Sequence, residues 1–98
     1  MTRKETLDTA AKCVCGDREQ DYGTPERNFQ TIADLWRIYL KGVAISAVDV
    51  AAMLALLKIA RISNGHNKDD NWIDLAGYAA CGAEIATTWS ENEALRGD

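Results

Sequence analysis

The sequence has little of what most metal and catalytic motifs need, because its 98 residues include one histidine, one proline and three cysteines. Cys13 and Cys15 have no second closely spaced pair, which excludes the ligand spacing of a structural zinc site. Helical positions two residues apart diverge by about 200°, so these two thiols would point apart. We therefore interpret the cysteines as buried thiols. The sequence also lacks a glycine-rich phosphate loop and a Ser-His-Asp arrangement.

Long apolar runs and a basic field are missing as well. No segment approaches the roughly 18–20 apolar residues that span a bilayer, and the N-terminal segment MTRKETLDTAAK is charged where a signal peptide is apolar. The net charge is -4, with 15 acidic and 11 basic residues, so no basic surface is available for a polyphosphate backbone. We therefore expect a cytoplasmic protein that binds neither nucleic acid nor a membrane.

What is present is the composition of a globular chain, with 47% hydrophobic residues and three tryptophans. The length allows one domain, residues 1–98, with a thin core that self-association would thicken. No alternating strand pattern competes with helical spacing. We predict an all-α domain of four helices over residues 2–18, 24–41, 46–62 and 69–90, with a frayed, flexible tail over 91–98.

Local signals set the starts of the middle helices. Thr24 followed by Pro25 is typical of an N-cap and first helical position, and Ser46 with Asp49 forms the S-x-x-D pattern of a capping box. The second helix is amphipathic, and its apolar face consists of Phe29, Ile32, Ala33, Trp36, Tyr39 and Leu40. The third is apolar almost all round, which predicts that it is the buried centre of the fold.

The short turn SNGHNK makes the third and fourth helices antiparallel neighbours. Folding the chain about His66 brings Lys58 level with Asp74, and Arg61 close to Asp70. One interpretation is structural, since charges on nearly buried helices are tolerated when they are paired. The other is functional: the two cations bind phosphate, while the aspartates orient them or hold a metal ion.

His66, Asp49 and the segment DREQDYG also contain polar groups, and each has a simple structural interpretation. His66 lies in the turn without a second ligand at metal spacing, so we interpret it as a surface residue. Asp49 approaches the level of Glu84 in the hairpin, but as a capping residue it already has a local role. The segment DREQDYG, with Arg18 and Tyr22, is either a solvated loop or a ligand lid.

Three segments carry a resemblance to known proteins: GDREQDYGTPERNFQTIADLWRIYL, DVAAMLALLKIARI and DNWIDLAGYAA. Together they resemble a small family of uncharacterised phage and prophage proteins over roughly residues 16–84. The hairpin more distantly resembles the MazG-like all-α NTP pyrophosphohydrolases. That resemblance implies a MazG-like four-helix arrangement around a central antiparallel hairpin, in a homo-oligomer.

The MazG-like enzymes hold magnesium with an E-x-x-E pair on one helix and an E-x-x-D pair on the next. By resemblance the second pair corresponds to Asn71 and Asp74, with Asp70 adjacent, whereas Lys58 and Arg61 stand at the level of the first pair. Two cations there would repel magnesium and attract phosphate. Magnesium bound by Asp70 and Asp74 remains an alternative.

The sequence thus predicts a phage-encoded protein that binds a nucleotide or related phosphorylated small molecule without catalysis. The predicted ligand residues are Lys58, Arg61, Asp70, Asp74, Tyr78, Arg18 and Tyr22. The resemblance suggests that such a protein sequesters a host signalling nucleotide or counters a host defence. The alternatives are a magnesium-dependent NTP pyrophosphohydrolase and a helical module that binds a host protein.

Overall fold

The computed structural model describes residues 1–17 and 23–95, with side chains for 1–16 and 23–87, and this part of the chain contains helices and no strand. The four α-helices are α1 (Arg3–Lys12), α3 (Pro25–Tyr39), α4 (Ala47–Ser63) and α5 (Asp69–Leu95), and a π-helical turn, η1 (Cys13–Asp17), follows α1. The predicted all-α class and the four predicted helices are confirmed.

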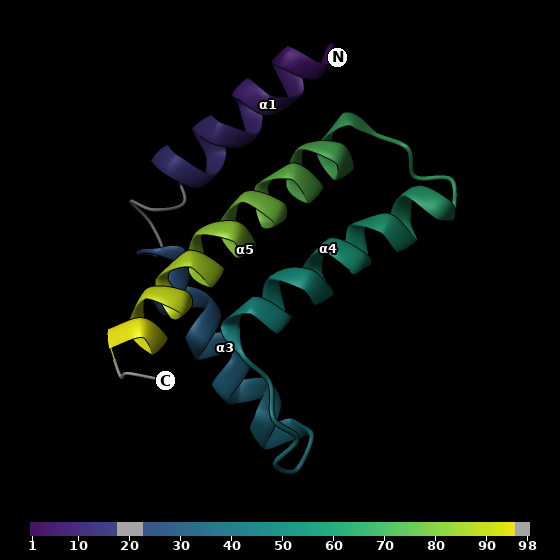
Figure 1. Cartoon of the computed structure of the whole chain (residues 1–98). Coiled ribbons are helices and arrows are strands. Elements are labelled where there is room, and N and C mark those ends of the chain that lie inside the picture. Colours follow the sequence, from purple (N-terminus) through teal and green to yellow (C-terminus); the bar gives the residue numbers. More distant parts are fainter. Residues whose placement is uncertain (18–22, 96–98) are drawn as a thin grey trace.

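Helix α5 is the centre of the arrangement. Figure 1 shows α4 and α5 side by side as an antiparallel hairpin, with α1 along the other side of α5. Helix α3 packs mainly against α4 and also contacts α5. No helix in the described residues is both long and apolar enough to cross a membrane.

The predicted starts of the two middle helices are confirmed. Thr24 caps α3 by accepting a hydrogen bond from the backbone N–H of Arg27 at 3.4 Å, with Pro25 as the first helical residue. At α4, the Asp49 N–H donates to Ser46 Oγ at 3.1 Å, and the Ser46 N–H donates to Asp49 Oδ2 at 2.9 Å. Such caps contribute about 1 kcal/mol each. The Asp49 carboxylate is therefore engaged at the helix start.

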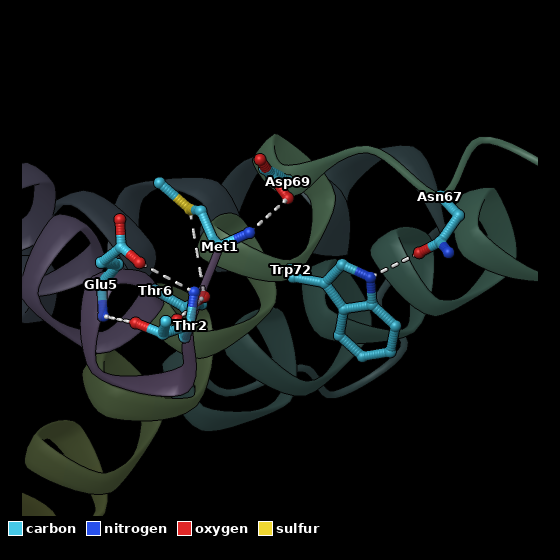
Figure 2. A network of polar contacts seen from close by, with 7 residues as sticks. All are labelled: Met1, Thr2, Glu5, Thr6, Asn67, Asp69 and Trp72. Atoms are coloured by element: carbon cyan, nitrogen blue, oxygen red, sulfur yellow. Dashed lines mark hydrogen bonds and ion pairs between the residues drawn. The ribbon is translucent and has the colours of Figure 1, made fainter.

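The N-terminus of α1 lies beside the start of α5 (Figure 2). Thr2 and Glu5 form a capping box, and the N–H and hydroxyl of Thr2 hold the pKa of the Glu5 carboxyl below its usual range. The Met1 amine lies 3.9 Å from Asp69 Oδ1. These contacts place the start of α1 at the start of α5, so the two helices run parallel.

Two helix ends differ from the prediction. The first α-helix stops at Lys12, and the chain continues as the wider turn η1, which brings Val14 onto α5: a Cβ on Gly77 would lie 3.0 Å from Val14 Cγ1. Helix α5 continues to Leu95, past the predicted end at residue 90. Glu, Ala and Leu, which dominate the added turn, have high helix propensity.

The buried core joins α3, α4 and α5. Its members are mostly small or branched: Phe29, Ala33, Ala47, Val50, Ala51, Cys81 and Ile85. Small residues allow the hairpin helices to approach closely, since a Cβ on Gly82 would lie 3.1 Å from Ala51 Cβ. Cys81 is buried as predicted, but Cys13 is half-buried and Cys15 is exposed, so the prediction of three buried thiols is wrong for those two.

The prediction that the third helix is the buried centre of the fold is wrong, because one side of it is exposed. Helix α4 buries the side that includes Val50 and Lys58, whereas Leu56 on the opposite side is 62% exposed. The other helices cover only one side of α4, so its second apolar face stays open. Tyr39 is likewise 84% exposed, because it lies in the last turn of α3, beyond the core residues of that helix.

Candidate functional site

The hairpin has the register that the sequence predicted. Lys58 on α4 lies opposite Asp74 on α5, with 2.9 Å between Lys58 Nζ and Asp74 Oδ2. Lys58 is only 8% exposed as a residue, and a third of the Asp74 side chain is exposed. The pair therefore lies at the edge of the interior, where one partner compensates the buried charge of the other.

A polar hollow of about 550 Å³ opens beside this pair, between the end of α4 and the start of α5. We call it the basic hollow. It is lined by Lys58, Arg61, His66, Lys68, Asp70, Asn71 and Asp74. Four of the seven predicted ligand residues are thus brought together at one site: Lys58, Arg61, Asp70 and Asp74.

The turn between α4 and α5 shapes one wall of the hollow. The buried Asn71 side chain donates a hydrogen bond to the backbone carbonyl of His66, which ties the turn to the first helical turn of α5. Trp72 Nε1 donates to Asn67 Oδ1 at 2.6 Å, as Figure 2 shows. Gly65 has φ +91, a conformation that favours glycine. These contacts fix the position of His66 and Lys68 at the hollow.

The hollow concentrates positive charge on an acidic chain. It has three cationic residues, Lys58, Arg61 and Lys68, against two carboxylates, although the net charge of the whole chain is -4. Arg61 is exposed, and no ion pair joins it to Asp70 among the described residues, so the predicted Arg61–Asp70 pair is not formed. The Arg61 guanidinium is available for an anionic ligand.

The structure places the two predicted metal ligands, Asp70 and Asp74, on the hollow. Among the side chains that the structure describes, those of residues 1–16 and 23–87, no three His, Cys, Asp or Glu lie close enough together to hold a metal ion. Asp74 is already engaged by Lys58. A carboxylate that compensates a lysine has less negative charge to offer a divalent cation.

Sequence reasoning missed the contribution of the turn. Lys68 and His66 line the hollow, and Asn71 is a buried structural amide. The location of residues 66–71 in the sequence could have indicated this, because they join two antiparallel helices whose facing residues were already identified as charged. Of the remaining predicted ligand residues, Arg18 and Tyr22 lie outside the described residues.

Tyr78, the last predicted ligand residue, lies at a second pocket, which we call the apolar pocket. The centroid of the Tyr78 ring is 6.4 Å from that of the Phe29 ring, and the two ring planes are tilted by 54°. The pocket has a volume of about 40 Å³ and lies between α1, η1, the start of α3 and α5. Its described lining is Ala10, Cys13, Val14, Gly23, Pro25, Asn28, Phe29, Ile73, Asp74, Gly77, Tyr78 and Cys81.

Comparison with known proteins gives one family and two phage relatives. Residues 5–86 match the family model described as "Domain of unknown function (DUF6378)". The chain is 45% identical over 73 residues to the Gene 55 protein of Mycobacterium phage L5. It is 38% identical over 92 residues to the Gene 55 protein of Mycobacterium phage D29.

The two alignments cover 74% and 94% of this chain, but 47% and 60% of the relatives. The chain therefore spans about half to three fifths of the length of the curated relatives it matches. No solved structure gives a significant match.

Proposed function

This chain belongs to the DUF6378 family, which includes phage proteins as the sequence predicted, and we propose that it binds a nucleotide or related phosphorylated small molecule in the basic hollow, without hydrolysing it. The observation that carries the proposal is the convergence of Lys58, Arg61 and Lys68 on one hollow beside the turn that joins α4 and α5. Arginine and lysine donate charge-assisted hydrogen bonds to phosphate oxygens, and arginine does so in a bidentate manner.

The proposal of binding rather than hydrolysis also draws on the distant MazG-like resemblance that the sequence suggests. In a MazG-like arrangement, the α4 side of the hairpin would supply carboxylates for magnesium, whereas this chain has Lys58 and Arg61 there. Magnesium activation of water needs several oxygen ligands around the ion, and two adjacent cations oppose that. The same cations favour direct contact with phosphate.

Arg61→Met should weaken the binding of inorganic pyrophosphate about tenfold, because one charge-assisted pair in a partly exposed site contributes roughly 1.5 kcal/mol. Isothermal titration calorimetry at constant ionic strength measures this change. Arg27→Met is the matched control, since Arg27 is an exposed arginine on α3 outside the hollow. Equal loss of affinity in both variants would mean that pyrophosphate responds only to the net charge of the chain.

The hydrolytic alternative is tested in the same preparation. A panel of nucleoside triphosphates with added magnesium should produce thermal stabilisation and no pyrophosphate release. Release that Asp74→Ala abolishes would establish magnesium-dependent hydrolysis and overturn the proposal of binding alone. A ligand present at 100 times its Kd adds about 2.7 kcal/mol of stability, which a thermal-shift measurement detects readily.

We also propose that the chain forms a homo-oligomer through the outer face of α4. The accessible surface of the chain is 7042 Å², whereas a compact monomer of 10.8 kDa is expected to expose about 5,500 Å². The excess exceeds the roughly 800 Å² that each partner buries in a standard interface. The outer face of α4 supplies apolar side chains for it, with Met53, Leu56 and Leu57 all exposed.

Leu56→Glu should therefore convert the oligomer to monomer, because it places a charge in the centre of that apolar face. Sedimentation or light scattering at tens of micromolar protein measures the mass. Leu7→Glu is the matched control: Leu7 on α1 is also 62% exposed but lies on another helix. A wild-type chain that is monomeric under these conditions would contradict the proposed interface.

For a phage protein, the proposed pocket suggests sequestration of a host signalling nucleotide or interference with a defence protein. A module that binds a host protein without a small ligand is the competing function, and the open apolar face of α4 fits it as well. The two differ in one measurable respect. Nucleotides stabilise the first kind of protein against unfolding, and they leave the second unchanged.

A further inference from the structure

The apolar pocket and the basic hollow share one residue, Asp74. Lys58 Nζ lies 2.9 Å from Asp74 Oδ2 at the hollow, and Asp74 is also one of the residues that line the apolar pocket. A ligand that fills both spaces would pass Asp74. Such a ligand has an anionic end for the hollow and an apolar body for the pocket.

The size of the apolar pocket limits that body. One water molecule needs at least about 10–15 Å³ of such a volume, so the 40 Å³ available holds about three. Three waters occupy roughly 90 Å³ of liquid, which is close to the size of one six-membered ring. Two fused rings would require the pocket to widen.

The lining of the pocket suits a planar ring with polar atoms at its edge. Phe29 and Tyr78 provide aromatic surface, while Val14 and Ile73 provide aliphatic surface. Asn28 is half-buried at the pocket, and its amide makes no hydrogen bond to another described residue. An amide carries both donors and an acceptor, which complement the alternating donors and acceptors on a pyrimidine edge.

We infer that the apolar pocket receives the ring of a pyrimidine nucleotide whose phosphates lie in the basic hollow. Asp74, at the junction, accepts a hydrogen bond from a sugar hydroxyl, which is the group that lies between ring and phosphate in a nucleotide. Arg61 and Lys68 bind the phosphates. This inference rests on the proposed function and names the class of nucleotide.

The test compares inorganic pyrophosphate, uridine diphosphate and adenosine diphosphate by calorimetry on the whole chain. Uridine diphosphate should bind at least about tenfold more tightly than pyrophosphate, and adenosine diphosphate should not gain over pyrophosphate. Cys13→Leu, which fills the pocket from its half-buried rim, should remove the gain of uridine diphosphate and leave pyrophosphate binding unchanged. Cys15→Leu, an exposed neighbour outside the pocket lining, should leave both unchanged.

Alkylation of the two cysteines gives a second readout that needs no variant. Saturating uridine diphosphate should slow the modification of Cys13 by iodoacetamide and leave that of the exposed Cys15 unchanged, as measured by mass spectrometry. Pyrophosphate should protect neither.

The outcomes separate the two proposals. If pyrophosphate binds and uridine diphosphate binds no better, or if both nucleotides gain equally, the pyrimidine assignment is overturned while the basic hollow stands. If neither pyrophosphate nor any nucleotide binds, the proposed function fails and this inference fails with it.

Discussion

Lys58→Met is expected to lower the free energy of unfolding by roughly 2 kcal/mol and to remove the stabilisation that pyrophosphate gives to the wild-type chain. Loss of one partner from a fully buried ion pair costs about 3–5 kcal/mol, because the remaining charge is left unpaired. The cost is smaller here because a third of the Asp74 side chain reaches solvent. Urea unfolding at fixed protein concentration, with and without pyrophosphate, measures both effects.

The double variant Lys58→Met with Asp74→Leu is the matched control for stability. Replacing both members of a buried pair by apolar side chains of similar size is often nearly neutral, so this variant should recover most of the lost stability. It should not recover pyrophosphate binding, since the lysine is still absent. If Lys58→Met loses stability but keeps the full pyrophosphate effect, then Lys58 is a structural residue only.

The hairpin could be predicted from sequence because its determinants are local. A short turn between two apolar helices fixes them as antiparallel neighbours, and counting outward from the turn gives the register. The contact between Lys58 and Asp74 confirms that count. Arg61 and Asp70, one helical turn nearer to the loop, line the same hollow without pairing. Counting residues outward from the turn predicts which residues of the two helices lie close together. Whether two of them form an ion pair depends also on the direction of each side chain.

The apolar pocket could not be predicted in the same way, because its walls come from segments distant in the sequence. Ala10 and Val14 come from the N-terminal region, Phe29 from α3 and Ile73 from α5. Their meeting depends on α1 running parallel to α5 and on the π-helical turn that follows it. The sequence pattern indicated a continuous helix through residue 18 and gave no signal for that turn.

The exposed face of α4 shows a second limit of the sequence pattern. A helix that is apolar all round is normally buried all round, but burial requires enough neighbouring surface. The other helices of this chain cover only one side of α4, and the radius of gyration, 14.7 Å, exceeds the roughly 13 Å expected for a compact domain of about this length. The apolar pattern of α4 therefore carries information about an interface as well as about the core of one chain.

Phe29→Ala is expected to destabilise the fold by about 3–4 kcal/mol, the cost of removing a large buried aromatic side chain and leaving a cavity. Phe29 is 5% exposed and is the largest residue of the buried core cluster. It also packs beside Tyr78 of α5, so its loss removes a contact between α3 and the hairpin. Because a domain of this size has only about 5–15 kcal/mol of stability, the variant should unfold at a clearly lower urea concentration.

Leu35→Ala is the matched control for Phe29→Ala. Leu35 lies on the same helix and is also a large apolar residue, but it is 59% exposed. Its truncation should change stability by no more than about 0.5 kcal/mol if that side of α3 faces solvent. A large loss for Leu35→Ala that depends on protein concentration would place α3 in the interface between chains. Equal, concentration-independent losses for the two variants would contradict the packing of α3 described above.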